Sequence, residues 1–280
     1  MSTDQSPNIW PFSLKPDSQE PLVRIGSKYD GGYIFPAALI ARTDRILTFG
    51  LGLNWDFERQ TDALIPLKAI HFYDHTITTR KLVGRFLLGC LLLPTRPIKR
   101  SSDVRRVIDY VRFISGTSHV THFRKMIGNR DSHTESSVNA AFDQMPDGDG
   151  ELILKCDIEG AEYLVLDALL DYAPRYAGLA IEFHDCGEHL DEITGFVSKL
   201  RETHRLDHFH VNNNSRLKGD RILNVIELSF SRKDISIADT KIPTTIAALE
   251  KSIDGRELDA PNNPNRPIIN ALFETPFDPQ

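Results

Sequence analysis

Short apolar runs alternate with amphipathic stretches along most of this 280-residue chain, and this alternation constrains the fold more than any other feature. Such alternation is typical of βα repeats around a parallel sheet. The last two runs are separated by too few residues for a helix, so we expect them to be antiparallel neighbours. The sequence therefore predicts an α/β fold with a doubly wound, seven-stranded sheet whose last strand is antiparallel. The seven runs lie at 46–52, 69–74, 120–127, 151–157, 177–184, 206–211 and 222–231.

The two ends of the chain and one internal stretch depart from this alternation. We expect residues 1–22 to form an arm, residues 23–236 to form the domain, and residues 237–280 to pack on it as an extended tail. A helical insertion is predicted at 76–118. It contains the apolar run 82–94, which is too short to cross a hydrocarbon layer of about 30 Å. This run predicts a helix that is buried or faces a partner, with peripheral membrane contact as the alternative.

The composition narrows the expected partners and compartment. A net charge of −6 gives no overall attraction to polyanions. We therefore expect a small-molecule or glycan substrate and no nucleic acid, although basic residues gather at 96–106. Three cysteines without a CxxC spacing indicate neither a disulfide framework nor a zinc site. With no signal-like pattern at the N-terminus, we expect a cytoplasmic protein.

Two glycines, Gly50 and Gly52, end the first core strand before a predicted helix. Glycine there lets a ligand approach the backbone, and the helix start offers free N–H groups. A plain strand-to-helix turn is the alternative, and Trp55 stands where a dinucleotide fingerprint needs its third glycine. Asp74 ends the second strand, where a carboxylate can accept both ribose hydroxyls or can simply cap a helix. Together these residues favour a nucleoside-type cofactor.

An acidic block follows a later strand and contains Asp157, Glu159 and Glu162. Burial of an uncompensated acid is costly, so Asp157 needs a partner, which can be a cofactor amine, a metal ion or Lys155. Glu162 can instead complement the dipole of the helix that it begins. We expect Asp157 and Glu159 to have a functional role rather than only to cap a turn.

Glu182 and His184 lie two residues apart on the next strand and therefore share a face beside Asp157. Two kinds of chemistry suit this set. His184 can act as a general base, with an orienting hydrogen bond as the alternative role. A divalent metal such as Mg²⁺ can also bind to Asp157, Glu182 and His184.

Three more histidines surround the following strand. His208 and His210 share a face, whereas His204 is expected to end the preceding helix. A three-histidine metal site is therefore disfavoured.

Asp30, Gly31 and Gly32 indicate a tight turn before Tyr33. Together with the segments above, this turn resembles the FkbM family of methyltransferases. The tail segment LDAPNNPNRP at 258–267 is similar to bacterial relatives. The resemblance spans about residues 22–270 and rests on RIGSKYDGGYIFP (24–36), LTFGLGLNWDFE (47–58), LKCDIEGAEYLVL (154–166), IEFH (181–184) and HFHVNNN (208–214).

The resemblance implies a class I methyltransferase fold, S-adenosylmethionine as methyl donor, and O-methylation of a sugar or natural-product hydroxyl. It places the methionine part of the cofactor beside Gly50 and Gly52 and the ribose at Asp74. Asp157 and Glu159 would border the reacting centre. The glycine segment lacks the family's usual early acid, so Asp30, with Gly31 and Gly32, or alternatively Asp56, becomes the candidate partner of the cofactor's amino group.

Two other functions are compatible with the same pattern. One is a nucleotide- or NAD-dependent sugar-modifying enzyme, which a complete phosphate-binding glycine motif would favour. The other is a catalytically inactive protein that binds a partner through residues 82–94. Binding of S-adenosylmethionine, of NAD or of neither separates the three.

Overall fold

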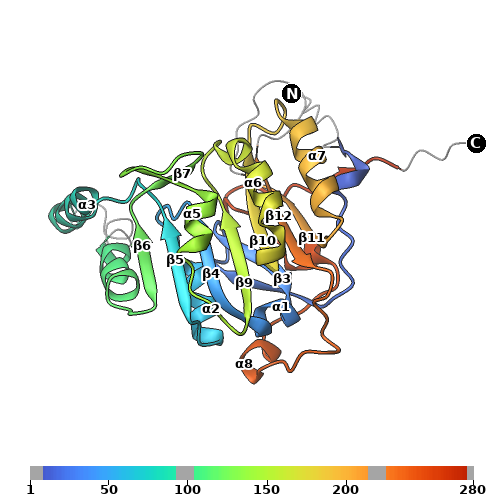
Figure 1. Cartoon of the computed structure of the whole chain (residues 1–280), viewed down its shortest axis with the longest axis horizontal. Coiled ribbons are helices and arrows are strands. Elements are labelled where there is room, and N and C mark those ends of the chain that lie inside the picture. Colours follow the sequence, from blue (N-terminus) through green and yellow to red (C-terminus); the bar gives the residue numbers. More distant parts are fainter. Residues whose placement is uncertain (1–8, 93–103, 214–224, 276–280) are drawn as a thin grey trace, which may run out of the picture.

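The computed structural model describes residues 9–92, 104–213 and 225–275, and its centre is a single twisted sheet (Figure 1). Seven strands lie in the order β11-β12-β10-β9-β4-β5-β6, and within this sheet only β12 runs antiparallel to its neighbours. This order and direction define the class I methyltransferase fold, so the predicted fold class is confirmed. The strands are β4 (Thr43–Phe49), β5 (Ala69–Tyr73), β6 (Val120–Phe123), β9 (Glu151–Cys156), β10 (Gly178–His184), β11 (His204–Val211) and β12 (Val225–Arg232).

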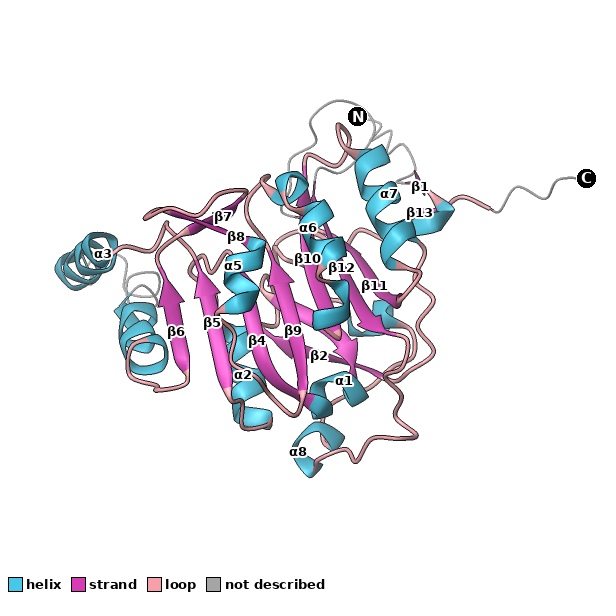
Figure 2. Cartoon of the chain, viewed as in Figure 1, coloured by secondary structure: helices cyan, strands magenta, loops and turns pink. Residues whose placement is uncertain are grey.

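Helices and a hairpin cover the two faces of the sheet (Figure 2). One apolar core forms under α5 (Val138–Asp143), α6 (Leu166–Asp171) and α7 (Leu190–Leu200). A second core forms on the opposite face, under α1 (Ala37–Arg42), α2 (Asp56–Leu64) and α8 (Thr244–Ala247). Burial of apolar surface on both faces explains why the central strands read as continuous apolar runs.

Short strands lie outside the main sheet. β2 (Leu22–Gly26) and β3 (Gly32–Pro36) form an antiparallel hairpin whose turn contains Asp30 and Gly31. The other pairs are parallel: β7 (Met126–Gly128) with β8 (Glu135–Ser137), and β1 (Ile9–Trp10) with β13 (Leu272–Phe273). The pairing of β1 with β13 joins segments from opposite ends of the chain.

The helical insertion stands at one edge of the molecule, beside β6 (Figure 1). It contains α3 (Thr79–Leu92) and helical residues 104–109, which continue as a π-helix, η2 (Tyr110–Ile114). We call residues 104–114 the second insertion helix. Residues 93 and 94 of the predicted 82–94 helix lie outside the described part. No helix within the described ranges has the length and apolar character needed to cross a membrane.

Several local predictions need correction. His204 begins β11 rather than ending a helix, because its buried ring forms a hydrogen bond at the Tyr176 carbonyl, 3.2 Å away. The expected helix at 161–170 is broken into the 3-10 turn η3 (Glu162–Leu164) and α6. The expected strand at 120–127 is divided into β6 and β7. The remaining 3-10 turns are η1 (Phe12–Leu14), η4 (Ala173–Arg175) and η5 (Gly255–Leu258).

The strand order reverses between β4 and β9. From β4 the chain proceeds outward to β5 and β6, and from β9 it proceeds the other way. In open α/β sheets, ligands bind outside the carboxyl ends of the strands at such a reversal. Gly50 follows β4 and Asp157 follows β9, so both lie at this position.

Candidate active site at the carboxyl edge of the sheet

The loop that follows β4 and contains Gly50 and Gly52, residues 50–55, is called the glycine loop, and it contacts the acidic block directly. The Asp157 N–H donates to the Phe49 carbonyl at 2.9 Å, and the Gly50 N–H donates to the Tyr73 carbonyl at 2.9 Å. Gly50 has a φ of +81°, and a Cβ at this position would lie 1.6 Å from the Asp157 carbonyl oxygen. Only glycine fits this approach. The structure therefore brings together the two segments that the sequence singled out separately.

Asp74 ties the glycine loop to the end of β5. Its Oδ2 accepts from the N–H groups of Leu51 (2.9 Å) and Gly52 (2.8 Å). Its Oδ1 accepts from those of Thr76 (2.5 Å) and Ile77 (3.3 Å). Burial raises the pKa of Asp74, but the hydrogen bonds from Thr76 and the loop outweigh this and lower it below its ordinary value. The carboxylate thus anchors the loop, a role that sequence reasoning missed. Its binding of ribose stays a prediction.

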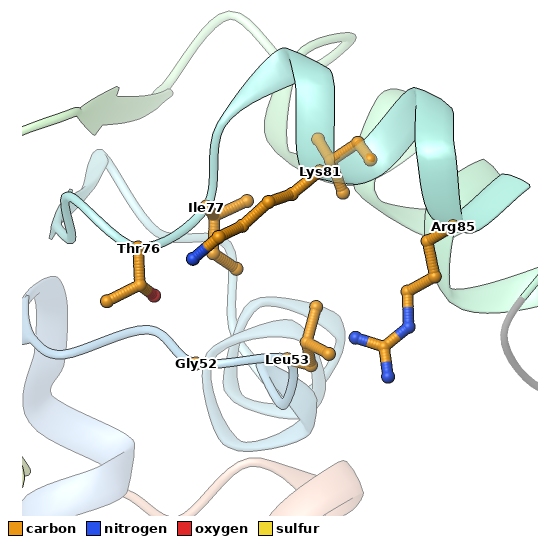
Figure 3. A pocket seen from close by; sticks show the side chains of 7 residues that line it. Gly52, Leu53, Thr76, Ile77, Lys81 and Arg85 are labelled. Atoms are coloured by element: carbon orange, nitrogen blue, oxygen red, sulfur yellow. The ribbon is translucent and has the colours of Figure 1, made fainter.

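A cavity of about 170 Å³ opens between this loop and the start of α3 (Figure 3). The Lys81 and Arg85 side chains extend toward it from α3. Gly52 has a φ of +55°, and a Cβ added there would meet no atom within 4 Å, so its missing side chain leaves open space. The lining residues are Gly52, Leu53, Thr76, Ile77, Lys81, Leu82 and Arg85.

A buried lysine, Lys155, approaches the same loop, and its charge acts on Asp157. The Lys155 Nζ donates to the Gly50 carbonyl at 3.4 Å and lies 3.9 Å from Glu58 Oε1. Burial lowers the pKa of Lys155, but the charges of Glu58 and Asp157 raise it above its ordinary value. Burial raises the pKa of Asp157 to about 6, with Lys155 and His184 opposing this rise. Asp157 therefore titrates near neutral pH, where a proton-transfer group is useful.

His184 is held by a buried carboxylate. Its Nδ1 lies 3.1 Å from Glu162 Oε1, and its Nε2 lies 3.6 Å from Glu159 Oε2. Glu162 is fully buried and also accepts from the N–H groups of Ile158 (3.0 Å) and Gly160 (3.0 Å). Burial lowers the pKa of His184, but the Glu162 hydrogen bond and charge raise it above 6.5. The sequence suggested a helix-dipole role for Glu162. In the structure Glu162 instead orients the His184 ring through Nδ1, which leaves Nε2 on the side of the exposed Glu159.

The backbone is strained on both sides of His184. Glu159 has a φ of +57° and Asp185 a φ of +50°, and no other non-glycine residue in the described ranges has a positive φ. Left-handed backbone at such residues costs on the order of 1–3 kcal/mol and is concentrated at functional sites. The strain directs Glu159, which is largely exposed, back toward the histidine.

The residues that can hold a metal differ from the predicted set. Asp157, Glu159 and His184 offer ligand atoms that all lie within 4.8 Å of one another. Glu182 is not part of any such group in the described residues, and its Oε1 accepts from Asn212 Nδ2 at 3.0 Å. Burial and the neighbouring Asp157 raise the pKa of Glu182 well above its ordinary value. The predicted metal set of Asp157, Glu182 and His184 is therefore not assembled, and Glu159 takes the place of Glu182.

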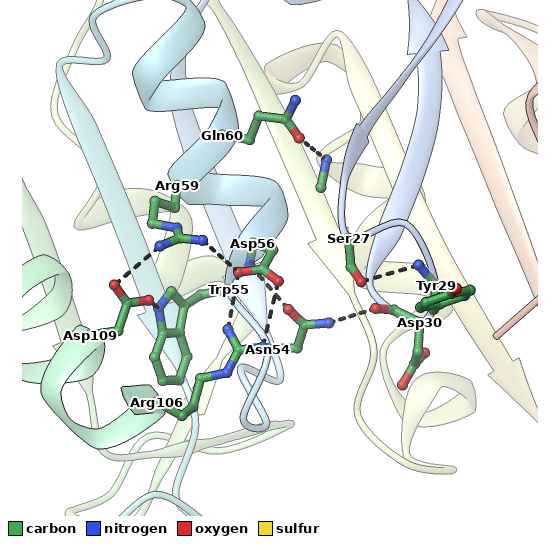
Figure 4. Close-up of polar contacts among 11 residues, drawn as sticks. Ser27, Tyr29, Asp30, Asn54, Trp55, Asp56, Arg59, Gln60, Arg106 and Asp109 are labelled. Atoms are coloured by element: carbon green, nitrogen blue, oxygen red, sulfur yellow. Dashed lines mark hydrogen bonds and ion pairs between the residues drawn. The ribbon is translucent and has the colours of Figure 1, made fainter. Parts of the chain in front are cut away.

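The turn of the β2–β3 hairpin reaches the glycine loop (Figure 4). Asn54 Nδ2 donates to the Asp30 carbonyl at 2.6 Å, and a Cβ on Gly31 would lie 2.1 Å from that nitrogen. A Cβ on Gly32 would lie 2.1 Å from the Ser27 carbonyl oxygen. The two glycine motifs therefore lie side by side. Asp30, one of the two acids considered for the cofactor's amino group, contacts this loop through its backbone carbonyl, whereas its carboxylate Oδ1 accepts from Asn262 Nδ2 at 3.3 Å.

The carboxylate of Asp56, the other acid, forms ion pairs with two arginines. Its Oδ1 lies 3.0 Å from Arg106 Nη1 and 3.1 Å from Arg59 Nη2 (Figure 4). The pair with Arg106 fastens the start of α2 to the second insertion helix, whereas the pair with Arg59 lies within α2. Asp56 therefore has a structural role.

The C-terminal segment closes the site from the β11 side. Asn262 Nδ2 donates to Glu227 Oε1 at 2.6 Å and to Asp30 Oδ1 at 3.3 Å, and Asn262 Oδ1 accepts from His210 Nε2 at 2.7 Å. Asp259 Oδ1 lies 3.0 Å from both His208 Nε2 and His210 Nδ1. The segments HFHVNNN and LDAPNNPNRP are thus parts of one network that reaches the hairpin turn. No single stretch of sequence signals this network.

Comparison with protein-family models and with curated protein sequences finds no match. Solved structures similar to this chain include precorrin-6y C5,15-methyltransferase from Geobacter metallireducens GS-15, with 12% identity, a TM-score of 0.36, and coverage of 70% of this chain and 86% of that one. Another is M. jannaschii TYW2 in complex with AdoMet, with 10% identity, a TM-score of 0.32, and coverage of 70% and 73%. A third is the B. subtilis M1A22 tRNA methyltransferase TrmK, with 12% identity, a TM-score of 0.33, and coverage of 72% and 68%.

The exclusion of nucleic acid as a partner is wrong, because structures similar to this chain include a tRNA methyltransferase. The error has a physical source. A net charge averages over the whole surface, whereas one cavity beside the second insertion helix is lined by four arginines and only two acids, Asp56 and Asp109. The arginines are Arg59, Arg105, Arg106 and Arg112. Such a local concentration of positive charge can attract a polyanion to an acidic protein.

Proposed function

We propose that this chain is an S-adenosylmethionine-dependent methyltransferase that methylates a hydroxyl group of a sugar or natural product. The observation that carries the proposal is the meeting of the glycine loop, Asp74 and the Asp157–His184 pair at the reversal of strand order. A nucleoside-containing ligand in the cavity between Gly52 and Thr76 would have its adenosyl part beside Asp74. Its methionine part would extend along Gly50 toward Asp157. The FkbM resemblance supports the same assignment.

The chemistry requires alignment and one proton acceptor. When bound, S-adenosylmethionine would supply its methyl group to the acceptor oxygen and would leave as S-adenosylhomocysteine, whose sulfur keeps the electron pair of the broken carbon–sulfur bond. The hydroxyl proton passes to His184 Nε2, while Glu162 holds Nδ1 and stabilises the imidazolium. Asp157, with its raised pKa, lies beside this path. Since the donor methyl is already activated, positioning supplies most of the remaining rate acceleration.

A divalent cation is a second way to activate the hydroxyl. Asp157, Glu159 and His184 provide the two carboxylates and one imidazole that such an ion accepts. The ion would lower the pKa of a bound hydroxyl. If a divalent cation activates the hydroxyl, EDTA should abolish methyl transfer and added Mg²⁺ should restore it. Unchanged transfer in EDTA would leave His184 as the base.

The proposal is tested with radiolabelled S-adenosylmethionine and separated cell-extract fractions of glycans, small molecules and RNA. We expect label in a hydroxyl-bearing glycan or small-molecule fraction, and none with the His184→Asn variant. Label confined to RNA would overturn the assigned acceptor while preserving the methyltransferase activity. Absence of label from every fraction, combined with absence of S-adenosylmethionine binding, would overturn the activity itself.

A further inference from the structure

An apolar groove of about 560 Å³ separates α3 from the second insertion helix. Apolar side chains from both helices line it, and among the residues that the structure describes no acidic side chain does. Its lining residues are Thr79, Leu82, Val83, Phe86, Val107, Ile108, Tyr110, Val111, Arg112, Ser115 and Arg124. Ligand sites have this character, being mostly apolar with a few polar groups.

Apolar side chains at the groove remain in contact with water. Val83 is 50% exposed, Val111 57% and Ile108 38%. Soluble proteins rarely leave large contiguous apolar patches uncovered unless something binds there. The groove therefore has the surface of a binding site whose occupant contributes apolar area.

The groove adjoins the cavity proposed for the cofactor. Leu82 lines both the groove and the cavity beside Gly52. Tyr110, which also lines the groove, has its hydroxyl 2.6 Å from His122 Nδ1, and His122 Nε2 lies 2.9 Å from the Asp74 carbonyl. An occupant of the groove consequently lies next to the elements that hold the glycine loop.

The charge at the groove indicates the polar part of the occupant. Arg112 and Arg124 are its two charged lining residues, and both are cations. Lys81 and Arg85 add positive charge at the adjoining cavity (Figure 3). Guanidinium groups suit phosphate and carboxylate oxygens. A ligand that combines an apolar chain with an anionic group matches both properties.

We propose that the groove binds the apolar chain of an anionic amphiphile, with the anionic group at Arg112 and Arg124. Its role as methyl acceptor rests on the function proposed above, and the binding itself does not. The acceptor hydroxyl would then lie on the polar part of the molecule, between the groove and the rim of the sheet. The methyl acceptor is then an amphiphile rather than a free polar sugar.

Monomeric dodecyl phosphate, kept below its micelle concentration, is the probe. Val83→Glu and Val111→Glu place a carboxylate in the groove and should weaken its binding by roughly tenfold or more, because the bound apolar chain would take water away from that charge. Leu87→Glu and Leu91→Glu are matched controls, since these exposed side chains, 61% and 76% accessible, lie on α3 but do not line the groove. We expect both controls to bind the probe as the wild type does.

Calorimetric titrations with dodecyl phosphate and with S-adenosylmethionine are run separately on each variant. Loss of probe binding in the groove variants, with unchanged S-adenosylmethionine affinity and unfolding temperature, supports the proposal. Absence of probe binding to the wild type, or equal loss in the control variants, overturns it. Binding only to phosphatidylglycerol vesicles would show that a bilayer covers this face, and a dimer that Val111→Glu dissociates would show that a second copy does. Either result overturns the proposal and leaves the cofactor assignment untouched.

Discussion

The two halves of the carboxyl edge are built in opposite ways. Over β9, β10 and β12, buried polar and charged groups such as Glu162, His184 and Asn262 are held in hydrogen bonds that reach the hairpin turn and the C-terminal segment. Over β4, β5 and β6, two cavities open and α3 leaves apolar side chains exposed. The first half is suited to hold reactive groups in fixed positions, and the second to admit ligands. The predictions below test whether this division of roles is real.

The largest effect is expected at Gly52, on the open half. Gly52→Val places a branched side chain in the cavity and in a left-handed backbone conformation. We expect S-adenosylmethionine binding to be lost in calorimetric titration while the far-UV spectrum is retained.

Gly50→Ala is the contrasting change, because its Cβ would lie 1.6 Å from the Asp157 carbonyl oxygen. This variant should lose folding stability as well as binding. A Gly52→Val protein that binds the cofactor normally would show that the ligand lies elsewhere.

The second effect concerns the fixed half. His184→Asn should reduce methyl transfer by about 10²–10⁴-fold, the usual contribution of a general base, and should leave cofactor affinity unchanged. His133→Asn, in an exposed loop, is the control. Because the pKa of His184 is raised, its neutral form accumulates only above about pH 6.5, so the wild-type rate should increase with pH through that raised pKa. A pH profile without this rise would exclude His184 as the base.

The third effect separates two roles of Asp74. Asp74→Ala should weaken S-adenosylmethionine binding by about 1–3 kcal/mol, since a buried charge-assisted network is lost. A 2′-deoxy analogue of S-adenosylhomocysteine distinguishes the reasons. Weaker binding of the analogue to wild type, but not to the variant, indicates a direct bond to ribose. Equal loss with both ligands indicates that Asp74 acts by anchoring the glycine loop.

Much of the open half was predictable from local sequence. Gly50, Gly52 and Asp74 each end an apolar run, and the alternation of runs fixes which edge of the sheet they share. The fold class followed from the same pattern and from the short connection before β12. The structure added that Asp74 is saturated by backbone N–H groups, which no spacing reveals.

The fixed half was less predictable because its contacts join distant segments. Asn262 forms a hydrogen bond with Asp30, which lies 232 positions earlier in the sequence. Asp259 pairs with His210 on β11, a strand dozens of residues earlier in the chain. The pairing of His184 with Glu162 was also missed, since the sequence favoured a functional role for Asp157 and Glu159 and a helix-dipole role for Glu162.

The smallest expected effect is a pH dependence of stability at the C-terminal segment. Burial lowers the pKa of His210, but Asp259 and Glu227 raise it to about 9. Stability from this pair is therefore complete below about pH 6.5 and lost as pH rises through about 9. Thermal unfolding from pH 6 to 10 should show this loss, and Asp259→Asn should remove it. A variant with the wild-type pH dependence would assign the effect to other groups.

The central claim is that the glycine loop, Asp74 and the Asp157 segment surround an adenosyl ligand. Calorimetric titration of the full chain with S-adenosylmethionine, and in parallel with NAD, tests it most directly. We predict saturable binding of S-adenosylmethionine and no heat with NAD. Binding of NAD alone, or of neither ligand at millimolar concentration, would contradict the account.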